Sequence, residues 1–316
     1  MKMENKTEKI IITEPKIYDA AAVSELKKIG EVEIKKPDED IGKKIKDATV
    51  LLCWVQDKID KSTIDMAPNL KIIATASAGM DHIDFSYAHK KGIKVFSAPG
   101  QNARAVAEFT FGLMLSLVRK INLCFDDVRM GKWQPLEYSG YELENKTLGL
   151  VGFGKIPRIV SDIAKGFGMD VIAYDAYVGK EEIEKSGARS VSLDYLLKNS
   201  DVVSLHVPLS NETKQMINED KISQMKPGIF LINTARGDIV DEQAVVDALK
   251  SKKLAGYACD VVSGDDPKKS VLLKNLKDER LSNVIITSHI AHGSEEAFDK
   301  CSSFVVEQIK KSIDAG

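Results

Sequence analysis

The chain has 316 residues, of which 43% are hydrophobic, and a formal net charge of −2 with a pI of about 6.3. This length and apolar content predict a globular protein of two domains, and the balanced charge without a basic cluster argues against a nucleic-acid partner. The four cysteines are scattered without CxxC spacing, which argues against a zinc site and a disulfide framework. The charged N-terminus (MKMENKTEK) has no apolar segment, which argues against a membrane span. We therefore expect a cytoplasmic protein that binds neither metal nor membrane.

The first third of the chain alternates short β-branched runs with helix-length segments. Strands are expected at 9–13, 31–34, 48–54, 71–76 and 94–98. This alternation is typical of a parallel α/β sheet with helices on both faces. The segment 103–121 is apolar over more than one helical face, which predicts a helix buried in the core or at a subunit interface.

The same alternation restarts at Leu148 and predicts a second parallel sheet. Its strands are expected to begin at 148 and to continue at 171–175, 201–207, 228–235, 255–261 and 283–290. The C-terminal segment 295–313 has a helical pattern, and we expect it to return to the first sheet.

The stretch LGLVGFGKIPRIV begins this second sheet and has the form of a dinucleotide-binding turn. A strand that ends in Gly152-x-Gly154 and opens a helix gathers backbone N–H groups and the positive end of the helix dipole, which bind a pyrophosphate. The amides of Lys155 and Ile156 are the expected donors. Pro157 replaces a third glycine that serves helix-to-strand packing, and within the first turn its missing N–H has no intrahelical partner. We therefore expect Pro157 to alter packing more than binding.

Asp175 ends the next strand, 23 residues after Gly152. This is close to the ~20-residue offset at which an acidic side chain accepts hydrogen bonds from the adenosine ribose. A carboxylate there also repels a 2′-phosphate. The sequence thus predicts NAD rather than NADP.

Polar residues follow three later strands, at the carboxyl edge where open α/β sheets bind ligands. Arg236 can hold a carboxylate through two parallel N–H bonds. His289 can transfer a proton near neutral pH. Three acids are candidates to orient this histidine, namely Asp260, Asp265 and Asp266.

Taken together, the chain resembles the D-isomer-specific 2-hydroxyacid dehydrogenases. The resemblance rests on SAGMDHID (77–84), the glycine turn, HVPL (206–209), NTARGDIVDEQAVVDAL, GYACDV and SHIA. It implies an α/β protein in which a Rossmann NAD-binding domain (100–292) is inserted into a flavodoxin-like substrate domain (1–99 and 293–316). It also implies a homodimer whose interface centres on the helix at 103–121.

The resemblance further implies the site residues. Arg236 would bind the substrate carboxylate, His289 would be the acid/base and Asp260 would orient the nicotinamide. Substrate contacts would come from Trp54, Val55 and the backbone amides of Ser77, Ala78 and Gly79. Cofactor contacts would come from Gly152, Phe153, Gly154, Lys155, Ile156, Asp175, His206, Val207, Pro208, Thr213, Thr234, Ala235 and Asp260.

Two positions depart from the family pattern. One is Pro157, and the other is the acidic partner of the histidine, a glutamate in the family but an aspartate in DVVSGDDP. Counting five positions from Asp260 selects Asp265, whereas adjacency to Pro267 selects Asp266. We favour Asp265 because the strand fixes where the loop begins.

We interpret the chain as an NAD-dependent oxidoreductase that transfers a hydride between nicotinamide and C2 of a small 2-oxo or 2-hydroxy acid of the D series. An NAD(H)-sensing scaffold, like the transcriptional corepressors that share this fold, is the alternative from another class. Within the enzyme class, D-3-phosphoglycerate dehydrogenase is the alternative. In the loop 53–60, Trp54 and Val55 stand where phosphate readers carry arginine, and Lys58 is the only cation. This favours a non-phosphorylated acid, although Arg104 and Lys155 keep the phosphorylated substrate open.

Four other reactive side chains are given structural interpretations. His292 is expected to support the site without reacting, and His82 and His89 are expected to be solvated. Cys259 lies inside an expected strand and is interpreted as a small buried hydrophobic residue.

Overall fold

The computed structural model describes residues 8–36, 38–278, 281 and 283–315. Most of the charged N-terminal stretch used above as an argument against a membrane span, residues 1–7, lies outside these ranges. The chain forms two compact units, one of Met1–Asn102 with Gly293–Gly316 and one of Ala103–His292. We call them unit 1 and unit 2. Unit 2 is inserted into the chain of unit 1.

Unit 1 contains a five-stranded sheet in the order β2-β1-β3-β4-β5, with every neighbouring pair parallel. Its strands are β1 (Glu8–Ile12), β2 (Gly30–Ile34), β3 (Val50–Cys53), β4 (Ile72–Thr75) and β5 (Lys94–Phe96). All five expected strands are present. The central strands β3 and β4 are buried along their whole length because helices cover both faces. The strand order is that of flavodoxin-like folds.

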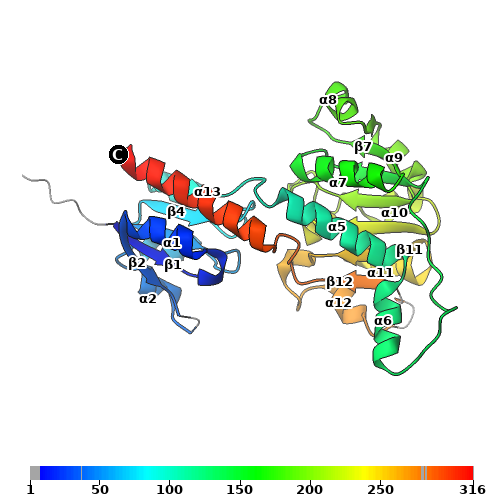
Figure 1. The fold of residues 1–316 in the computed structure, drawn as a ribbon, viewed down its shortest axis with the longest axis horizontal. Helices are drawn as coiled ribbons and strands as arrows, with labels where there is room; N and C mark the ends of the chain where they lie inside the picture. The colour runs from blue at the N-terminus through cyan, green and yellow to red at the C-terminus, as the bar shows by residue number, and fades with distance from the viewer. Residues whose placement is uncertain (1–7, 37, 279–280, 282, 316) are drawn as a thin grey trace, which may run out of the picture. The chain divides into compact units, whose positions relative to one another are not determined.

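Helices pack on both faces of this sheet (Figure 1). One face carries η1 (Pro15–Ile17), α1 (Ala20–Lys27) and α13 (Glu295–Asp314), and the other carries α2 (Ile41–Ile45), α3 (Lys61–Asp65) and α4 (Phe85–Lys90). Helices α1 to α4 each begin at an aspartate that accepts a backbone N–H bond, the preferred N-cap arrangement. Buried α13 residues such as Val305 and Ile309 join the core of the first sheet, so the predicted return of the C-terminal helix is confirmed.

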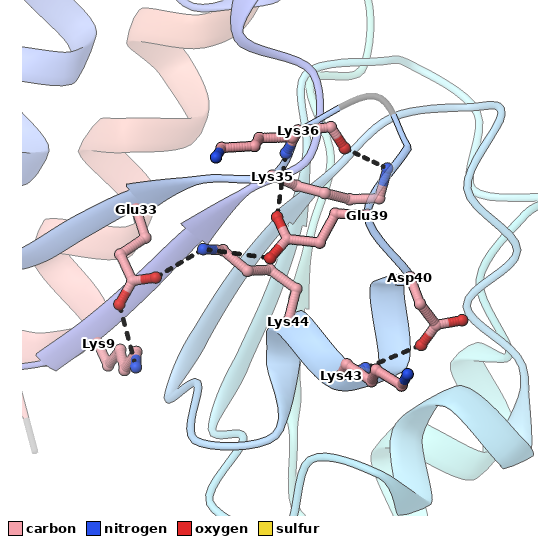
Figure 2. A network of polar contacts seen from close by, with 8 residues as sticks. All are labelled: Lys9, Glu33, Lys35, Lys36, Glu39, Asp40, Lys43 and Lys44. Carbon is pink, nitrogen blue, oxygen red and sulfur yellow. Dashed lines mark hydrogen bonds and ion pairs between the residues drawn. The ribbon is translucent and has the colours of Figure 1, made fainter.

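Charged side chains border the outer strand β2 (Figure 2). The Nζ atom of Lys44 lies 2.7 Å from Glu33 Oε2 and 3.8 Å from Glu39 Oε1, and the Nζ atom of Lys9 lies 3.0 Å from Glu33 Oε1. Charged side chains on an outer strand oppose pairing with another sheet. This network therefore protects an edge whose backbone groups would otherwise be open to a further strand.

Unit 2 contains a seven-stranded parallel sheet in the order β12-β11-β10-β9-β6-β7-β8. Its strands are β6 (Thr147–Val151), β7 (Asp170–Tyr174), β8 (Arg189–Ser190), β9 (Val202–Leu205), β10 (Ile229–Asn233), β11 (Leu254–Cys259) and β12 (Val284–Ile286). The short strand β8 was not predicted, because two residues carry no detectable period. The order is that of a Rossmann fold and reverses between β6 and β9.

Helices cover both faces of the second sheet as well. One face carries α9 (Leu193–Asn199), α10 (Glu219–Gln224), α11 (Glu242–Lys250) and α12 (Val271–Asn275), and the other carries α5 (Ala103–Val118), α7 (Lys155–Gly166) and α8 (Lys180–Lys185). The predicted fold class, two parallel-sheet α/β units with one inserted into the other, is confirmed. No helix in the described part of the chain is long and apolar enough to cross a membrane.

The apolar segment expected as a helix over 103–121 forms a helix over nearly its whole length, and only its last residue, Ile121, belongs to a second helix. Helix α5 ends at Val118 and packs in the core of unit 2. Lys120 adopts left-handed backbone geometry (φ 54°), which ends regular helix, and α6 (Ile121–Arg129) begins directly after it. None of the residues of α6, all of which the structure describes, is buried.

Candidate functional site

The glycine turn lies where the strand order of unit 2 reverses, the point at which such sheets bind ligands. Gly152 follows β6 with a φ of 96°, and a Cβ atom there would lie 2.7 Å from the carbonyl oxygen of His206, after β9. Only glycine satisfies both constraints. A Cβ on Gly154 would meet nothing within 4 Å, so this position leaves open space in front of the helix. Gly154 is the N-cap of α7, and among the described residues no side chain caps this helix.

Pro157 is accommodated in the first turn of α7, as its missing N–H allows. The helix runs from Lys155 to Gly166, with Pro157 buried at its third position. The amide of Arg158 still bonds to the carbonyl of Gly154 at 3.4 Å. The proline therefore neither delays the start of the helix nor breaks it, and the backbone N–H groups of Lys155 and Ile156 are retained at the turn.

Asp175 holds the glycine turn from the end of β7. Its Oδ2 accepts the backbone N–H of Phe153 at 2.6 Å, and its Oδ1 accepts those of Tyr177 and Val178 at 2.8 and 3.0 Å. Burial raises the pKa of Asp175, but the N–H bonds from Tyr177, Val178 and Phe153 outweigh it and hold the pKa below its ordinary value. The carboxylate is thus ionised and fixed beside the turn.

The residues after β9 form a polar turn next to Gly152. The ring Nε2 of His206 lies 2.9 Å from the hydroxyl of Ser204, and burial lowers the pKa of His206 to about 3. Val207 packs close to Gly152. Thr213 donates to the carbonyl oxygen of Pro208 at 2.6 Å. His206 is therefore a neutral hydrogen-bonding group and not a proton donor at neutral pH.

A second group of polar residues follows β10, β11 and β12. The ring Nδ1 of His289 lies 2.8 Å from Oδ2 of Asp265, and both side chains are partly exposed. The hydrogen bond from His289, together with the charges of His289 and Arg236, lowers the pKa of Asp265 despite its partial burial. Arg236 is thus near enough to Asp265 to affect its ionisation. Unit 2 brings together the arginine, the acid and the histidine, and the acid in contact is Asp265 rather than Asp266.

Asp260 holds the turn that carries His289. It is 1% exposed, and it accepts the hydroxyl of Thr287 at 2.5 Å and the backbone N–H groups of Ile290 and Ala291 at 2.9 and 2.7 Å. Its carbonyl oxygen accepts the N–H of His289 itself at 2.8 Å. Both carboxylate oxygens thus accept hydrogen bonds from the turn that carries His289. The sequence did not reveal this structural role.

The backbone of the Arg236 turn is fixed by neighbouring side chains. The side-chain amide of Asn233 donates to the carbonyl oxygen of Arg236 at 2.8 Å, and its oxygen accepts the N–H of Ala235 at 3.0 Å. The hydroxyl of Thr234 lies 3.0 Å from that of Thr110 on α5. The guanidinium of Arg236 donates to the carbonyl of Ala235 at 2.7 Å.

The expected substrate residues of unit 1 lie after β3 and β4. Ser77 is buried, its hydroxyl donates to the carbonyl of Gly79 at 2.8 Å, and Ala78 lies between them, half-buried. After β3, Trp54 and Val55 are half-buried, and the Trp54 ring meets Phe298 of α13 edge to face with centroids 6.2 Å apart. Both segments follow carboxyl ends of parallel strands.

The residues given structural interpretations have varied surroundings. His292 meets the His289 ring at a centroid distance of 5.8 Å, and burial and the charge of His289 lower the pKa of His292. His89 is exposed on α4 and stacks on Phe85. The expectation for His82 was wrong, because its Nε2 lies 3.8 Å from Cys53 Sγ in a half-buried turn. Cys259 is fully buried in β11, and burial raises its pKa to about 12, as expected for a core residue.

Sequence reasoning did not identify the roles of Asp238 and Glu242, which bind the loop that carries Asp265. Both lie in the RGDIVDE stretch after β10. The only signal was a run of acids at the start of a helix, which is also typical of a solvated surface.

The order of strands and the glycine turn define a dinucleotide-binding α/β protein, and comparisons with known proteins agree. Residues 111–291 match the family described as D-isomer specific 2-hydroxyacid dehydrogenase, NAD binding domain. The chain therefore belongs to the D-isomer specific 2-hydroxyacid dehydrogenase family, and unit 2 is its NAD-binding domain.

Individual relatives cover nearly the whole chain. It is 39% identical over 308 residues to D-3-phosphoglycerate dehydrogenase of Methanocaldococcus jannaschii, covering 96% of this chain but only 57% of that relative. It is 37% identical to glyoxylate reductase of Thermococcus litoralis, covering 93% of this chain and 92% of the relative. The crystal structure of D-lactate dehydrogenase from Aquifex aeolicus complexed with NAD and lactic acid superposes with a TM-score of 0.83 at 35% identity, covering 98% of this chain and 96% of that one.

Replacing Asp175 by alanine tests its two expected effects. The change removes an acceptor for three backbone N–H groups, so NADH affinity should fall about tenfold, equivalent to roughly 1.4 kcal/mol. It also removes a negative charge that repels a 2′-phosphate, so the preference for NADH over NADPH should narrow. Fluorescence titration with both cofactors measures the two constants. Asp170→Ala, at the exposed start of the same strand, is the matched control. Equal affinity of the unmodified protein for NADPH and NADH would contradict the assignment.

Proposed function

We propose that this protein is an NAD-dependent oxidoreductase acting on a small, non-phosphorylated 2-oxo or 2-hydroxy acid of the D series. The observation that carries the proposal is the 2.8 Å contact between His289 Nδ1 and the Asp265 carboxylate, with Arg236 close enough to lower the pKa of Asp265. An arginine for an anionic substrate and a histidine held by an acid are the groups that carbonyl reduction requires.

Each side chain has a distinct role in this reaction. Bound nicotinamide would exchange a hydride with C2 of the acid. Arg236 binds the carboxylate and polarises the carbonyl oxygen. His289, through Nε2, donates a proton to the oxygen during reduction and accepts it in the reverse direction. Asp265 accepts the Nδ1–H bond, which fixes the tautomer and stabilises the protonated ring. In unit 1, the amides of Ser77, Ala78 and Gly79 are proposed as substrate contacts.

The preference for a non-phosphorylated acid rests on the loop after β3. Trp54 and Val55 present apolar groups there, and the Lys58 side chain, 83% exposed, lies 3.3 Å from Asp60. Arg104, one of the two further cations considered for a phosphate, lies 3.4 Å from Glu108 on the surface of α5. The described contacts thus pair Lys58 and Arg104 with acids.

A panel of 2-oxo acids with NADH tests the activity. Glyoxylate, pyruvate, hydroxypyruvate and 3-phosphohydroxypyruvate should be compared by NADH oxidation at 340 nm. We expect the highest kcat/KM for a non-phosphorylated member. A preference for 3-phosphohydroxypyruvate would overturn the substrate proposal alone, whereas no turnover by folded, NADH-bound protein would favour a nucleotide-sensing scaffold.

Replacing Asp265 by asparagine tests the proton relay. The loss of a carboxylate 2.8 Å from Nδ1 disfavours the protonated ring that reduction needs. The high-pH limb of kcat/KM should therefore move to lower pH by about one unit, equivalent to roughly 1.4 kcal/mol, and the rate near neutral pH should fall. The control is Asp266→Asn, since Asp266 lies 3.6 Å from Lys269. An equal shift in both variants, or in neither, would count against Asp265 as the partner.

We also propose that the protein is a homodimer. Because α5 packs in the core of unit 2, we place the interface not on the helix at 103–121 but on α6 and the segment that follows it, residues 121–141. In Figure 1, α6 lies outside the layers of unit 2. The segment exposes large apolar side chains, namely Ile121, Phe125, Val128, Met130, Trp133, Leu136 and Tyr141. Trp133 is 82% exposed and Leu136 is 88% exposed. An apolar surface of this kind marks a protein interface, and in a two-fold dimer the same patch on both copies can be self-complementary.

A charged substitution in this segment should disrupt the dimer. Leu136→Asp places an ionised group in the proposed interface, which should weaken association by at least about a hundredfold, roughly 2.7 kcal/mol. Analytical ultracentrifugation across a concentration series gives the dissociation constant. Met66→Asp, at an exposed apolar residue of unit 1, is the control. A monomeric unmodified protein at micromolar concentration would reject the dimer.

A further inference from the structure

The loop that carries Asp265 has an unfavourable backbone conformation. Gly264 has a φ of 61° and Asp265 itself a φ of 51°, both in the left-handed region. For a residue with a Cβ atom this region costs about 1–2 kcal/mol. Asp265 is also exposed, so the burial of its own side chain does not hold it there. The conformation needs support from other parts of unit 2.

Asp238 supplies contacts at the residues just before Asp265. Its Oδ1 accepts the hydroxyl of Ser263 at 2.5 Å, and its Oδ2 accepts the backbone N–H of Gly264 at 3.3 Å. Asp238 belongs to η2 (Gly237–Ile239), the short 3-10 turn directly after Arg236. The turn that carries the arginine therefore also holds the loop that carries the acid.

The backbones of these two segments are in direct contact. The loop begins as η3 (Ser263–Asp265), after Val262. A Cβ atom on Gly237 would lie 2.0 Å from the carbonyl oxygen of Val262, so glycine alone permits this approach. The close fit leaves the Asp238 carboxylate within reach of Ser263 and Gly264.

Glu242, at the start of α11, holds both ends of the same loop. It is 7% exposed, and its Oε1 accepts the N–H of Ser263 at 2.8 Å. Its Oε2 accepts the N–H groups of Val271 and Leu272 at 2.6 and 3.1 Å. Between these ends, backbone bonds from Asp265 to Val262 and from Asp266 to Ser263 form the turn, and the bond from Gly264 to Asp238 connects it to η2.

We propose that Asp238 is a positioning residue, which sets the Asp265 carboxylate against His289 by holding Ser263 and Gly264. The importance of Asp238 for turnover rests on the proposed function. Its placement of Asp265 against His289 does not rest on that function. The side chain of Asp265 is one methylene shorter than that of the glutamate that the family resemblance implies as the partner of the histidine. A shorter side chain has less freedom to compensate for a displaced backbone, so the loop must be held more closely.

Several other groups in unit 2 act on the same histidine. The His292 ring lies at 5.8 Å, and Arg236 acts on Asp265. The Asp260 carboxylate binds the turn on either side of His289. A substitution at Asp238 removes none of these side chains. Its effect on His289 therefore reports the placement of Asp265.

The proposal is tested by Asp238→Ala with two measurements. An NMR titration of the His289 ring, assigned with His289→Gln, should give a midpoint about one unit lower than in the unmodified protein, approaching that of Asp265→Asn. The kcat for reduction should fall about tenfold, equivalent to a rise of about 1.4 kcal/mol in the activation free energy of the chemical step, while the NADH dissociation constant changes less than twofold. Asp238→Asn keeps an oxygen that can accept the Ser263 hydroxyl. Its midpoint should therefore lie between that of Asp238→Ala and that of the unmodified protein.

Asp247→Ala, which removes an exposed acid from α11, controls for net charge and should leave the midpoint unchanged. If Asp265→Asn lowers the midpoint but folded Asp238→Ala does not, Asp238 has no positioning role. If Asp238→Ala fails to fold, Ser263→Ala removes the same hydroxyl bond, and an unchanged midpoint in that folded variant overturns the proposal. Absence of turnover in the unmodified protein would reject the proposed function, while the titration would still decide the positioning role.

Discussion

The position of the His289 imidazole depends on the buried carboxylate of Asp260. His289 lies beyond β12, a three-residue strand at the edge of the sheet, and its φ of 58° is left-handed. Neither a short edge strand nor this conformation would fix a side chain. Asp260 continues β11 inside the sheet and binds the turn through Thr287, Ile290 and Ala291. These hydrogen bonds thus fix the turn that carries His289 relative to the interior of the sheet.

A close backbone contact and one carboxylate together determine the shape of the glycine turn. Gly152 lies against the carbonyl of His206 because β6 and β9 are adjacent where the strand order reverses. Asp175 holds the turn from the neighbouring strand. With both contacts in place, the third position of the motif serves only packing, and Pro157 fits it inside the first helical turn. Pro157 therefore changes a packing contact. The backbone N–H groups of Lys155 and Ile156 stay at the turn.

The sequence predicted both sheets and the return of α13, because parallel strands covered on both faces leave a strong apolar pattern. It did not predict β8, or the break at Lys120, which depends on one left-handed residue. Polar residues after strands singled out Arg236 and His289 as candidates, and the family pattern favoured Asp265 over Asp266. The roles of Glu242 and Asp260 were not predicted, because their bonds span 21 to 31 residues. An acid in a loop has the same sequence signature whether it is solvated or buried against backbone N–H groups.

The insertion of unit 2 also orders events on the ribosome. The β1 to β5 strands leave the exit tunnel early, but α13, which covers one face of their sheet, is synthesised only after the whole of unit 2. At about 5–20 residues per second this delay is on the order of 10–40 s. During that time the apolar face formed by Ile10, Ile12, Leu52 and Ile72 has no α13 to cover it. The nascent chain is thus most susceptible to aggregation in its first domain, while the inserted domain, continuous in sequence, can complete its folding first.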